Sequence, residues 1–224
     1  VALLPGFGFD KDGIANIPAR TVQTFDNVAA NLHCNANDSH VSMGLLAGWI
    51  AKQQVHVNAG FVGLGKMSNT AFFPDGTTYN TLKSSIAAIA GKGFIVPTKR
   101  GQKAGYFYFD DPTLTATTNV YSSISWNRVI NKVHRIASEV LLEKLNADVP
   151  LDEATGKIET TIAADWESDV ENAVKVAMMK QTATTAKEIS GIKCTVSTDS
   201  DIANNEVDAT IEVVRNGQSK TINV

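Results

Sequence analysis

The sequence predicts an α+β (mixed α/β) fold, in which a mixed sheet is packed with helices and the chain closes with a β-hairpin. A long amphipathic helix is expected over residues 125–146, because apolar residues recur there every three or four positions. A second helix with the same period is expected over 160–181, and strand-like alternation follows from Gly191. Helices and strands therefore share the chain without the strict alternation of a parallel α/β fold.

The helix over 125–146 is the element that the other parts should pack against. Its apolar stripe is wider than a coiled-coil seam, so a sheet or other helices should cover it. The stripe contains Trp126, Val129, Ile130, Val133, Ile136, Ala137, Val140 and Leu141. The helix over 160–181 is its expected packing partner. The apolar face of that partner contains Ile162, Trp166, Val170, Ala173, Val174 and Ala177. Trp126 and Val133 should be buried, whereas Leu142 projects on the polar side and is expected to contact another subunit.

Before this helix the sequence predicts a succession of shorter elements. Residues 1–20 fit a strand end and a loop, and residues 21–32 fit either a strand or a helix. A helix should begin at Asp38 or Ser39, which are capping residues, and end at Gln53. The next elements expected are a strand over 55–62, a loop over 63–76, a helix over 78–90, and strands over 94–97 and 104–109.

The last part of the chain is expected to consist of strands and turns. Residues 192–197 and 206–215 alternate as strands do, and Asn216-Gly217 separates the second of them from 218–224. Asn-Gly accepts the positive φ of a type I′ turn, so these last two strands are predicted to form a hairpin. The hairpin ends without a charged or proline gatekeeper, and its edge is expected to pair with a neighbouring subunit. The residues expected at this contact are Thr221, Ile222 and Val224.

Length and composition set bounds on the organisation of the chain. Its 224 residues, 43% hydrophobic and 19% charged, can bury the core of one large domain or two small ones. We expect one region over 1–118 and another over 119–224, joined in a continuous structural unit. The apolar start at Val1, in place of Met, favours a piece of a longer polypeptide.

The charge pattern argues against some partners and favours self-association. A net charge of −3 gives no reason to expect nucleic acid or an anionic membrane. The longest apolar stretch, 44–51, is far shorter than the roughly 20 residues of a membrane span, and no signal peptide opens the chain. A basic patch and an acidic face over 152–171 are expected to meet across a subunit contact. The residues expected there are Lys92, Lys99, Arg100 and Lys103 on one side, and Asp165, Glu167, Asp169 and Glu171 on the other.

Several clusters could carry chemistry, and none forms a recognised constellation. Residues 60–66 match most of the phosphate loop G-x-x-x-x-G-K-[ST], but Met67 stands at the hydroxyl position, which favours a structural glycine loop. His134 lies at the edge of the long helix's apolar face, as structural histidines often do. Cys34 and Cys194 define no disulfide framework, and a reducing compartment is expected.

Two groups of polar residues contain side chains that can bind a metal ion. The first, without a recognised ligand spacing, is His33, Cys34, Asp38 and His40. The second, without the glycine and terminal spacing of an EF-hand, is Asp199, Asp201, Asn204, Asn205 and Glu206. We therefore expect no cofactor, no metal ion and no catalytic residue.

Three stretches together resemble contractile phage tail sheath proteins. The first is SHVSMGLLAGWIA from Ser39, a small-residue helix, with VHVNA after it. The second is GFIVPTKRG from Gly93, then the strand over 105–109, then SWNRVINKVHRI from Ser125, which matches paired strands before a long arginine-bearing helix. The third is IKCTVSTD from Ile192 with the final hairpin. By this resemblance, 1–118 is the remainder of a sheath core region and 119–224 is the sheath C-terminal region.

The resemblance implies a structural subunit and not an enzyme. Sheath subunits stack as rings around a tail tube and contract to drive it through a target envelope, and related sheaths serve contractile injection systems. The implied partners are further copies in a helical homo-oligomer and the tail tube protein. The implied location is the virion tail, after assembly in the bacterial host cytoplasm. Two other classes stay open: a small-molecule or nucleotide-binding α/β enzyme, and a surface or pilus-like adhesion module that polymerises by strand exchange.

Overall fold

The computed structural model describes residues 43–67, 79–113, 115–116, 118–182, 186–199 and 206–218 of the chain. The chain divides into two compact units, Val1–Asn127 and Arg128–Val224. The long helix α4 (Ile124–Leu142) begins in the first unit and continues into the second. The two regions expected from the sequence met between residues 118 and 119, ahead of this helix.

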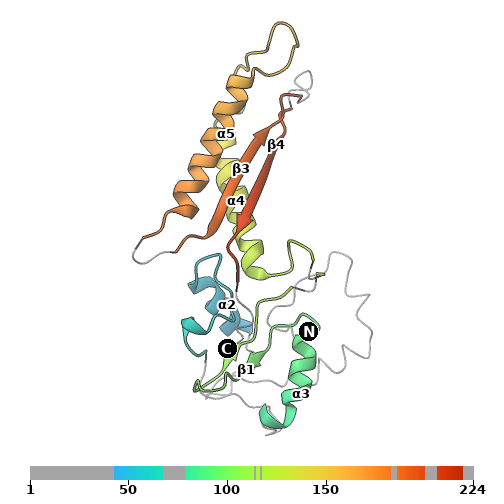
Figure 1. The fold of residues 1–224 in the computed structure, drawn as a ribbon, viewed down its shortest axis with the longest axis vertical. Helices are drawn as coiled ribbons and strands as arrows, with labels where there is room; N and C mark the ends of the chain where they lie inside the picture. Colours follow the sequence, from blue (N-terminus) through green and yellow to red (C-terminus); the bar gives the residue numbers. More distant parts are fainter. Residues whose placement is uncertain are drawn as a thin grey trace. The chain divides into compact units, whose positions relative to one another are not determined.

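The described part of the first unit combines helices with one small sheet (Figure 1). Its elements, in chain order, are α2 (Met43–Lys52), the 3₁₀ helix η2 (Val62–Leu64), α3 (Tyr79–Ala90), β1 (Pro97–Thr98) and β2 (Phe107–Tyr108). β1 and β2 pair antiparallel, with Pro97 opposite Tyr108. The helices predicted over 38–53 and 78–90 are confirmed, except that residues 38–42 and 78 lie outside the described residues. The strands predicted over 94–97 and 104–109 also pair, but each has only two residues, and β1 begins at the last residue of its predicted range.

A buried cluster around Tyr108 forms the described core of the first unit. Leu46 of α2, Ala59, Ile95 and Tyr108 pack together in it. The ring of Trp49 meets the ring of Tyr108 edge-on, with centroids 6.3 Å apart. Nε1 of Trp49 also donates a hydrogen bond to the carbonyl of Ala59 at 3.2 Å, so α2 is held against the segment that follows it.

The strand predicted over 55–62 was wrong, because these residues make turns and then enter η2. Oδ1 of Asn58 accepts a hydrogen bond from the backbone N–H of Gly60 at 2.7 Å. Nδ2 of Asn58 donates to the carboxylates of Asp110 and Asp111, at 2.6 and 2.7 Å. An asparagine that bonds its own backbone two residues on closes a turn and competes with a strand ladder.

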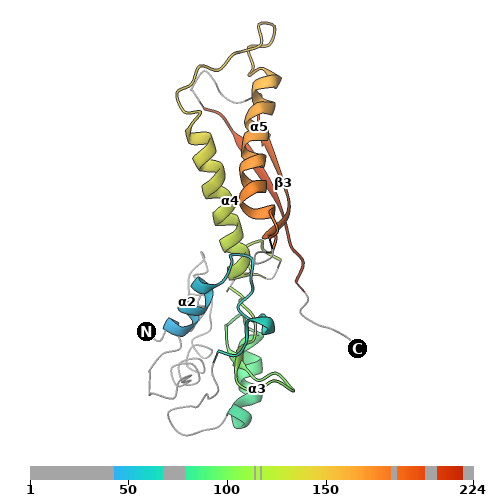
Figure 2. The same ribbon diagram turned by 90° about the vertical axis from the view of Figure 1, so that its left-hand side faces the viewer.

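The second unit packs two helices with a two-stranded sheet. After α4 come α5 (Thr160–Val174), the π-helical turn η3 (Lys175–Met179), β3 (Ile189–Val196) and β4 (Ala209–Arg215). β3 and β4 are antiparallel, with Val196 opposite Ala209 and Cys194 opposite Ile211. Figures 1 and 2 show α5 alongside β3, on the side away from β4, while α4 runs across one face of the sheet.

The core of the second unit confirms that α5 is the packing partner of α4. Ala137 of α4, Val170 of α5 and Cys194 of β3 share one buried cluster, against which Ile211 of β4 packs. Val133 is also buried as predicted, at 2% exposed. In the first turn of α4, which belongs to the first unit, Trp126 is buried as predicted.

One residue that was predicted to lie on the buried face of the helix over 160–181 is exposed in the structure. Ala177 is exposed, whereas Met178 is only 1% exposed. Both lie in η3, whose π-helical hydrogen bonds join residues five apart instead of four, so each turn contains more residues than a turn of α-helix. The buried positions therefore follow Val170 and Val174 at a spacing of four residues, and the buried side passes from Ala177 to Met178.

The α+β class predicted from the sequence is confirmed, but the sheet organisation differs. Among the described residues the strands form two separate two-stranded antiparallel sheets and no single mixed sheet. The type I′ turn predicted at Asn216-Gly217 is absent, because neither residue is among the described ones with positive φ. The strand over 206–215 was predicted to pair with 218–224, whereas β4 pairs with β3. Residues 219–224 lie outside the described residues.

Candidate assembly interface

The outer edge of β3, away from β4, is bonded to carboxylates of α5. The backbone N–H of Val196 donates to Oε1 of Glu167 at 2.8 Å, and that of Cys194 donates to Oε1 of Glu171 at 3.1 Å. These two N–H groups therefore point away from β4. Two of the donors that an edge strand would offer to another strand are taken up within the chain.

The spacing of the two glutamates explains how a helix can accept hydrogen bonds from the edge of a strand. Glu167 and Glu171 are four residues apart on α5, which is a rise of about 6 Å along the axis. Alternate residues of a strand, such as Cys194 and Val196, are about 6.6 Å apart. The two repeats nearly match, so successive turns of α5 reach successive outward N–H groups of β3.

The opposite edge of the same sheet, along residues 209–213 of β4, accepts no such carboxylate from a helix in the described part of the chain. Cys194 and Val196 point their N–H groups away from β4, so they form non-hydrogen-bonded pairs with Ile211 and Ala209. Ile211 and Ala209, like Val213 two residues on, therefore turn their own N–H and C=O groups away from β3. No described strand pairs with β4 on that side.

The residues of β4 do little to blunt this open edge. The strand, ATIEVVR, contains neither proline nor lysine, and Glu212 is its only charge before the terminal Arg215. Val214 is 60% exposed. Natural edge strands usually carry proline, lysine or a bulge that hinders pairing, and here the described bulge lies on β3, between Ile189 and Gly191.

The predicted acidic face is split between two roles. Glu167 and Glu171 are half-buried and face β3, so they are not part of a free acidic surface. Asp165 and Asp169 are exposed, and Asp169 forms an ion pair with Lys144 at 2.8 Å. Within this ion pair the side chain of Lys144 also donates a hydrogen bond to Asp169, and this bond raises the pKa of Lys144. The sequence pattern could have indicated the difference, because only Glu167 and Glu171 recur four residues apart on the side of the buried Val170 and Val174.

Two residues of the predicted basic patch, Lys99 and Arg100, contact aromatic rings in the first unit. Lys99 is exposed, and its Nζ lies 5.1 Å from the ring centroid of Tyr106 and 5.8 Å from that of Tyr79. The guanidinium of Arg100 lies 5.5 Å from the ring of Phe109 and donates to the carbonyl of the same residue at 3.0 Å. Cation–π contacts of this kind hold both side chains in place.

The remaining predicted contact residues fall into three groups. Lys92 and Lys103 are exposed. Leu142, at the end of α4, is 66% exposed, as expected for its position on the polar side. The last group lies outside the described residues and consists of Thr221, Ile222 and Val224.

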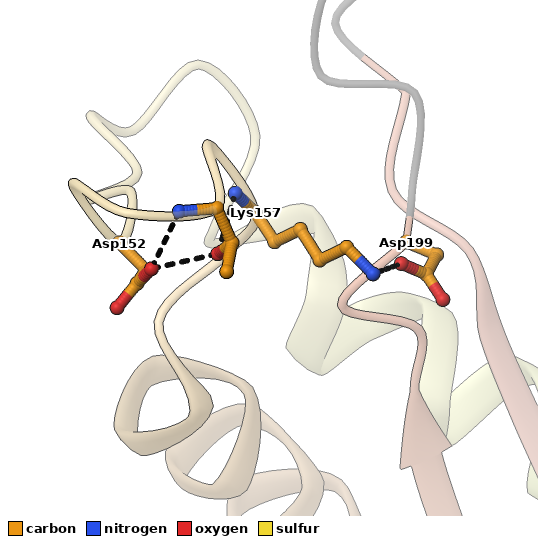
Figure 3. Close-up of polar contacts among 4 residues, drawn as sticks. Asp152, Lys157 and Asp199 are labelled. Atoms are coloured by element: carbon orange, nitrogen blue, oxygen red, sulfur yellow. Dashed lines mark hydrogen bonds and ion pairs between the residues drawn. The ribbon is translucent and has the colours of Figure 1, made fainter.

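A tight turn between α4 and α5 holds the first residues of the predicted acidic face (Figure 3). Oδ1 of Asp152 accepts from the hydroxyl and the backbone N–H of Thr155, at 2.7 and 2.8 Å. Hydrogen bonds from Thr155, first that of its hydroxyl, lower the pKa of Asp152. Gly156 follows with φ 67°, a left-handed conformation that favours glycine. Lys157 forms an ion pair with Asp199, which is one of the two described residues of the acidic cluster compared with a calcium loop, the other being Glu206.

The glycines of the phosphate-loop-like stretch have structural roles. A Cβ on Gly60 would lie 2.6 Å from the carbonyl oxygen of Phe109, and a Cβ on Gly63 would meet the ring of Phe61. Gly65 has φ 90°. These three constraints explain the glycines without a bound phosphate.

The described residues contain no group of three or more metal-ligating side chains. The cluster of possible metal ligands from His33 to His40 lies outside them. Cys194 is a buried free thiol, and burial raises its pKa. His134 is exposed, with its Nδ1 3.5 Å from the hydroxyl of Ser138. Within the described part of the chain, no helix is both long and apolar enough to cross a membrane.

Residues 121–224 match the protein family described as DUF2586, C-terminal domain. The match includes all of the second unit, and with it α5, the β3–β4 sheet and both of its edges. A comparison with curated proteins gives no match.

Proposed function

We propose that the protein is a structural subunit of a contractile phage-type tail sheath, whose copies polymerise into a helical sleeve around a tail tube. The resemblance of three stretches of its sequence to sheath proteins suggested this function. The observation that carries it is the β3–β4 sheet, in which α5 closes the outer edge of β3 while the outer edge of β4 stays open among the described residues.

An open edge of this kind supports assembly by strand addition. Backbone groups of Ala209, Ile211 and Val213 face outward and offer a ladder of hydrogen bonds to one more strand. Such a ladder connects subunits through backbone atoms, so it does not require the rest of the two subunits to keep one orientation. A sleeve that contracts by moving rigid bodies needs connections with this property.

We propose that the added strand comes from residues 218–224 of a second copy. A type I′ turn at Asn216-Gly217 would have returned this segment onto its own β4, and that turn does not form. The side chain of Asn216 instead accepts from the hydroxyl of Ser190 at 2.7 Å and donates to the carbonyl of Lys187 at 2.6 Å. No type I′ turn therefore returns the chain onto β4 at Asn216-Gly217, and this supports pairing of the segment with a neighbour instead.

The charges of the two units also favour contacts between copies. The first unit has nine lysine and arginine residues against seven aspartates and glutamates, and the second has eleven against sixteen. Units of opposite net charge attract across a subunit contact, which raises the rate of encounter and helps to set the register. The proposed partners are thus further copies of the chain and a tube protein, within a virion tail assembled in the bacterial cytoplasm.

Negative-stain electron microscopy of the purified protein tests the proposal, because sheath-like tubes are directly visible. We expect tubes from the unaltered protein and from Val213→Thr, which keeps the outward N–H. We expect none from Val213→Pro, since proline removes that N–H and blocks an edge without touching the bonds to β3. An unaltered protein that stays monomeric over a range of salt and protein concentrations rejects the sheath function. Normal tubes from Val213→Pro reject the β4 edge as the joint.

A further inference from the structure

We propose that Glu167 and Glu171 make strand addition one-sided, by acting as a surrogate strand that keeps the β3 edge of the sheet closed. One part of this inference, that a strand of another copy is added at β4, rests on the proposed assembly function. The closure of the β3 edge itself stands on the contacts of α5 with β3.

The carboxylates satisfy the β3 edge in a way that another strand cannot share. They accept hydrogen bonds from two of the outward N–H groups of β3, those of Val196 and Cys194, at 2.8 and 3.1 Å. An ionised carboxylate can only accept hydrogen bonds, so it repels the carbonyl groups that an incoming strand would bring to the same edge. A strand could bind there only by displacing both carboxylates.

Glu171 is held in place from two sides. Its Oε1 accepts from Cys194, and its Oε2 forms an ion pair with Nζ of Lys175 at 2.6 Å, one turn further along the helix. Val170, between the two glutamates, is 0% exposed and anchors α5 in the core. The helix therefore presents its carboxylates to β3 from a fixed position.

The consequence is a sheet with an accepting edge and a closed edge. Each copy would take up one strand, at β4, and β3 would not nucleate a second pairing. A subunit with two open edges would join neighbours in more than one order, which leads to irregular aggregates and not to a sleeve of defined connectivity.

Backbone amide hydrogen exchange of the unassembled protein, read residue by residue by NMR, tests the closure. In Glu171→Ala we expect the amide of Cys194 to exchange about tenfold faster while that of Val196 keeps its rate, since one hydrogen bond to a charged group is lost. In Glu167→Ala we expect the reverse. Thr195 provides an internal reference because its N–H faces β4, and Asp165→Ala on the exposed side of α5 should change neither rate.

The outcomes separate this inference from the proposed function. Unchanged exchange at Cys194 and Val196 overturns the closure, and so does a uniform rise that includes Thr195, because it would mean general loosening. With both glutamates changed to Ala, we expect irregular association that survives Val213→Pro. If Val213→Pro still abolishes association of this double variant, Glu167 and Glu171 are not what restricts strand addition to the β4 edge. Normal tubes from the variant that carries Val213→Pro and both glutamates count against strand addition at β4. They do not change the conclusion from the exchange rates.

Discussion

The buried carboxylate of Asp111 accepts a hydrogen bond from the backbone N–H of Ser125 at 2.9 Å, in the first turn of α4. The carbonyl of Asp111 accepts from the N–H of Ile124 at 2.8 Å, so one residue satisfies two of the donors that a helix leaves unpaired at its start. The other oxygen of the carboxylate receives the side-chain amide of Asn58. The first turn of α4 is thus held by a loop of its own unit.

Replacing Asp111 with Ala should destabilise the protein by about 1.5 to 3 kcal/mol, because a hydrogen bond to a buried charged group is lost. Urea denaturation followed by tryptophan fluorescence would measure this. Ser123→Ala is the smaller comparison: its hydroxyl accepts from the N–H of Trp126 at 3.2 Å, as a capping residue does, and its loss should cost about 1 kcal/mol. Equal stability of Asp111→Ala and the unaltered protein would mean that this cap contributes nothing.

Trp126→Ala should cost about 3 to 5 kcal/mol, because it removes a large buried side chain and leaves a cavity. Trp126 is 9% exposed, whereas Val120, in the turn before α4, is 56% exposed. Val120→Ala should therefore stay within about 0.5 kcal/mol of the unaltered protein. Thermal unfolding of both variants compares the two positions, and a similar loss in each would contradict the burial of Trp126.

Helical periodicity was the most reliable signal in the sequence. It located α4 and α5 and their contact through Ala137 and Val170, because long amphipathic stripes have few alternative structures. It failed at Ala177, because the prediction assumed the same α-helical period throughout and a π-helical turn has a different one. The alternation over 55–62 failed for a different reason: the side-chain bonds of Asn58 close a turn there.

The candidate interface was predicted only in part. The sequence predicts a contact surface from the acidic residues of 152–171, because it shows where charge lies along the chain but not which way each side chain points. The structure turns Glu167 and Glu171 onto the backbone of β3, and this pairing joins residues more than twenty positions apart. The sequence gives no spacing rule for such contacts, whereas the exposure of Leu142 followed from its place on the polar side of one helix.

The closure of the β3 edge should weaken in acid. Hydrogen bonds from the Lys175 ammonium and then from the N–H of Cys194 lower the pKa of Glu171 from its ordinary value of 4.5. A lowered pKa in the folded state means that ionised Glu171 stabilises the fold at pH values above 4.5. This stabilisation is lost as the pH falls below 4.5 and through the lowered pKa.

Melting temperatures of the unaltered protein and Glu171→Gln, measured from pH 7 to pH 3, test this dependence. The difference between the two proteins should be largest at neutral pH and should shrink below pH 4.5, because Gln cannot titrate. Asp165→Asn serves as the control for removing a charge from the same helix. A difference that stays constant over the whole range would show that ionisation of Glu171 does not stabilise the fold.

Assembly should depend on salt through the basic segment. Reversing Lys99 and Arg100 to Glu should reduce polymer formation at low salt, and so should reversing Lys92 and Lys103. The effect should fade as salt rises, because exposed charges are screened beyond about 8 Å at physiological ionic strength. Lys99 and Arg100 also contact aromatic rings, so their reversal should lower the melting temperature as well, whereas reversal of the exposed Lys92 and Lys103 should not.

Light scattering against salt concentration measures this effect. Lys83→Glu on α3 is a matched control, since it reverses an exposed charge elsewhere on the same unit. Polymer formation that is unchanged at low salt in both reversed pairs would exclude the basic segment from the contact. An equal loss from Lys83→Glu would mean that net charge matters and not its location.

Leu142→Asp should separate assembly from folding. Leu142 is 66% exposed at the end of α4, so its replacement removes little buried surface and should leave the melting temperature within about 1 °C of the unaltered protein. If another subunit covers this leucine, a buried aspartate there would have to lose its hydration without a partner, and assembly should fail. Leu142→Gln keeps a similar volume without a charge and should assemble at a reduced level. Electron microscopy and thermal unfolding of the two variants give both readouts: a large drop in melting temperature would place Leu142 in the core, and unchanged tubes from Leu142→Asp would leave it outside every contact.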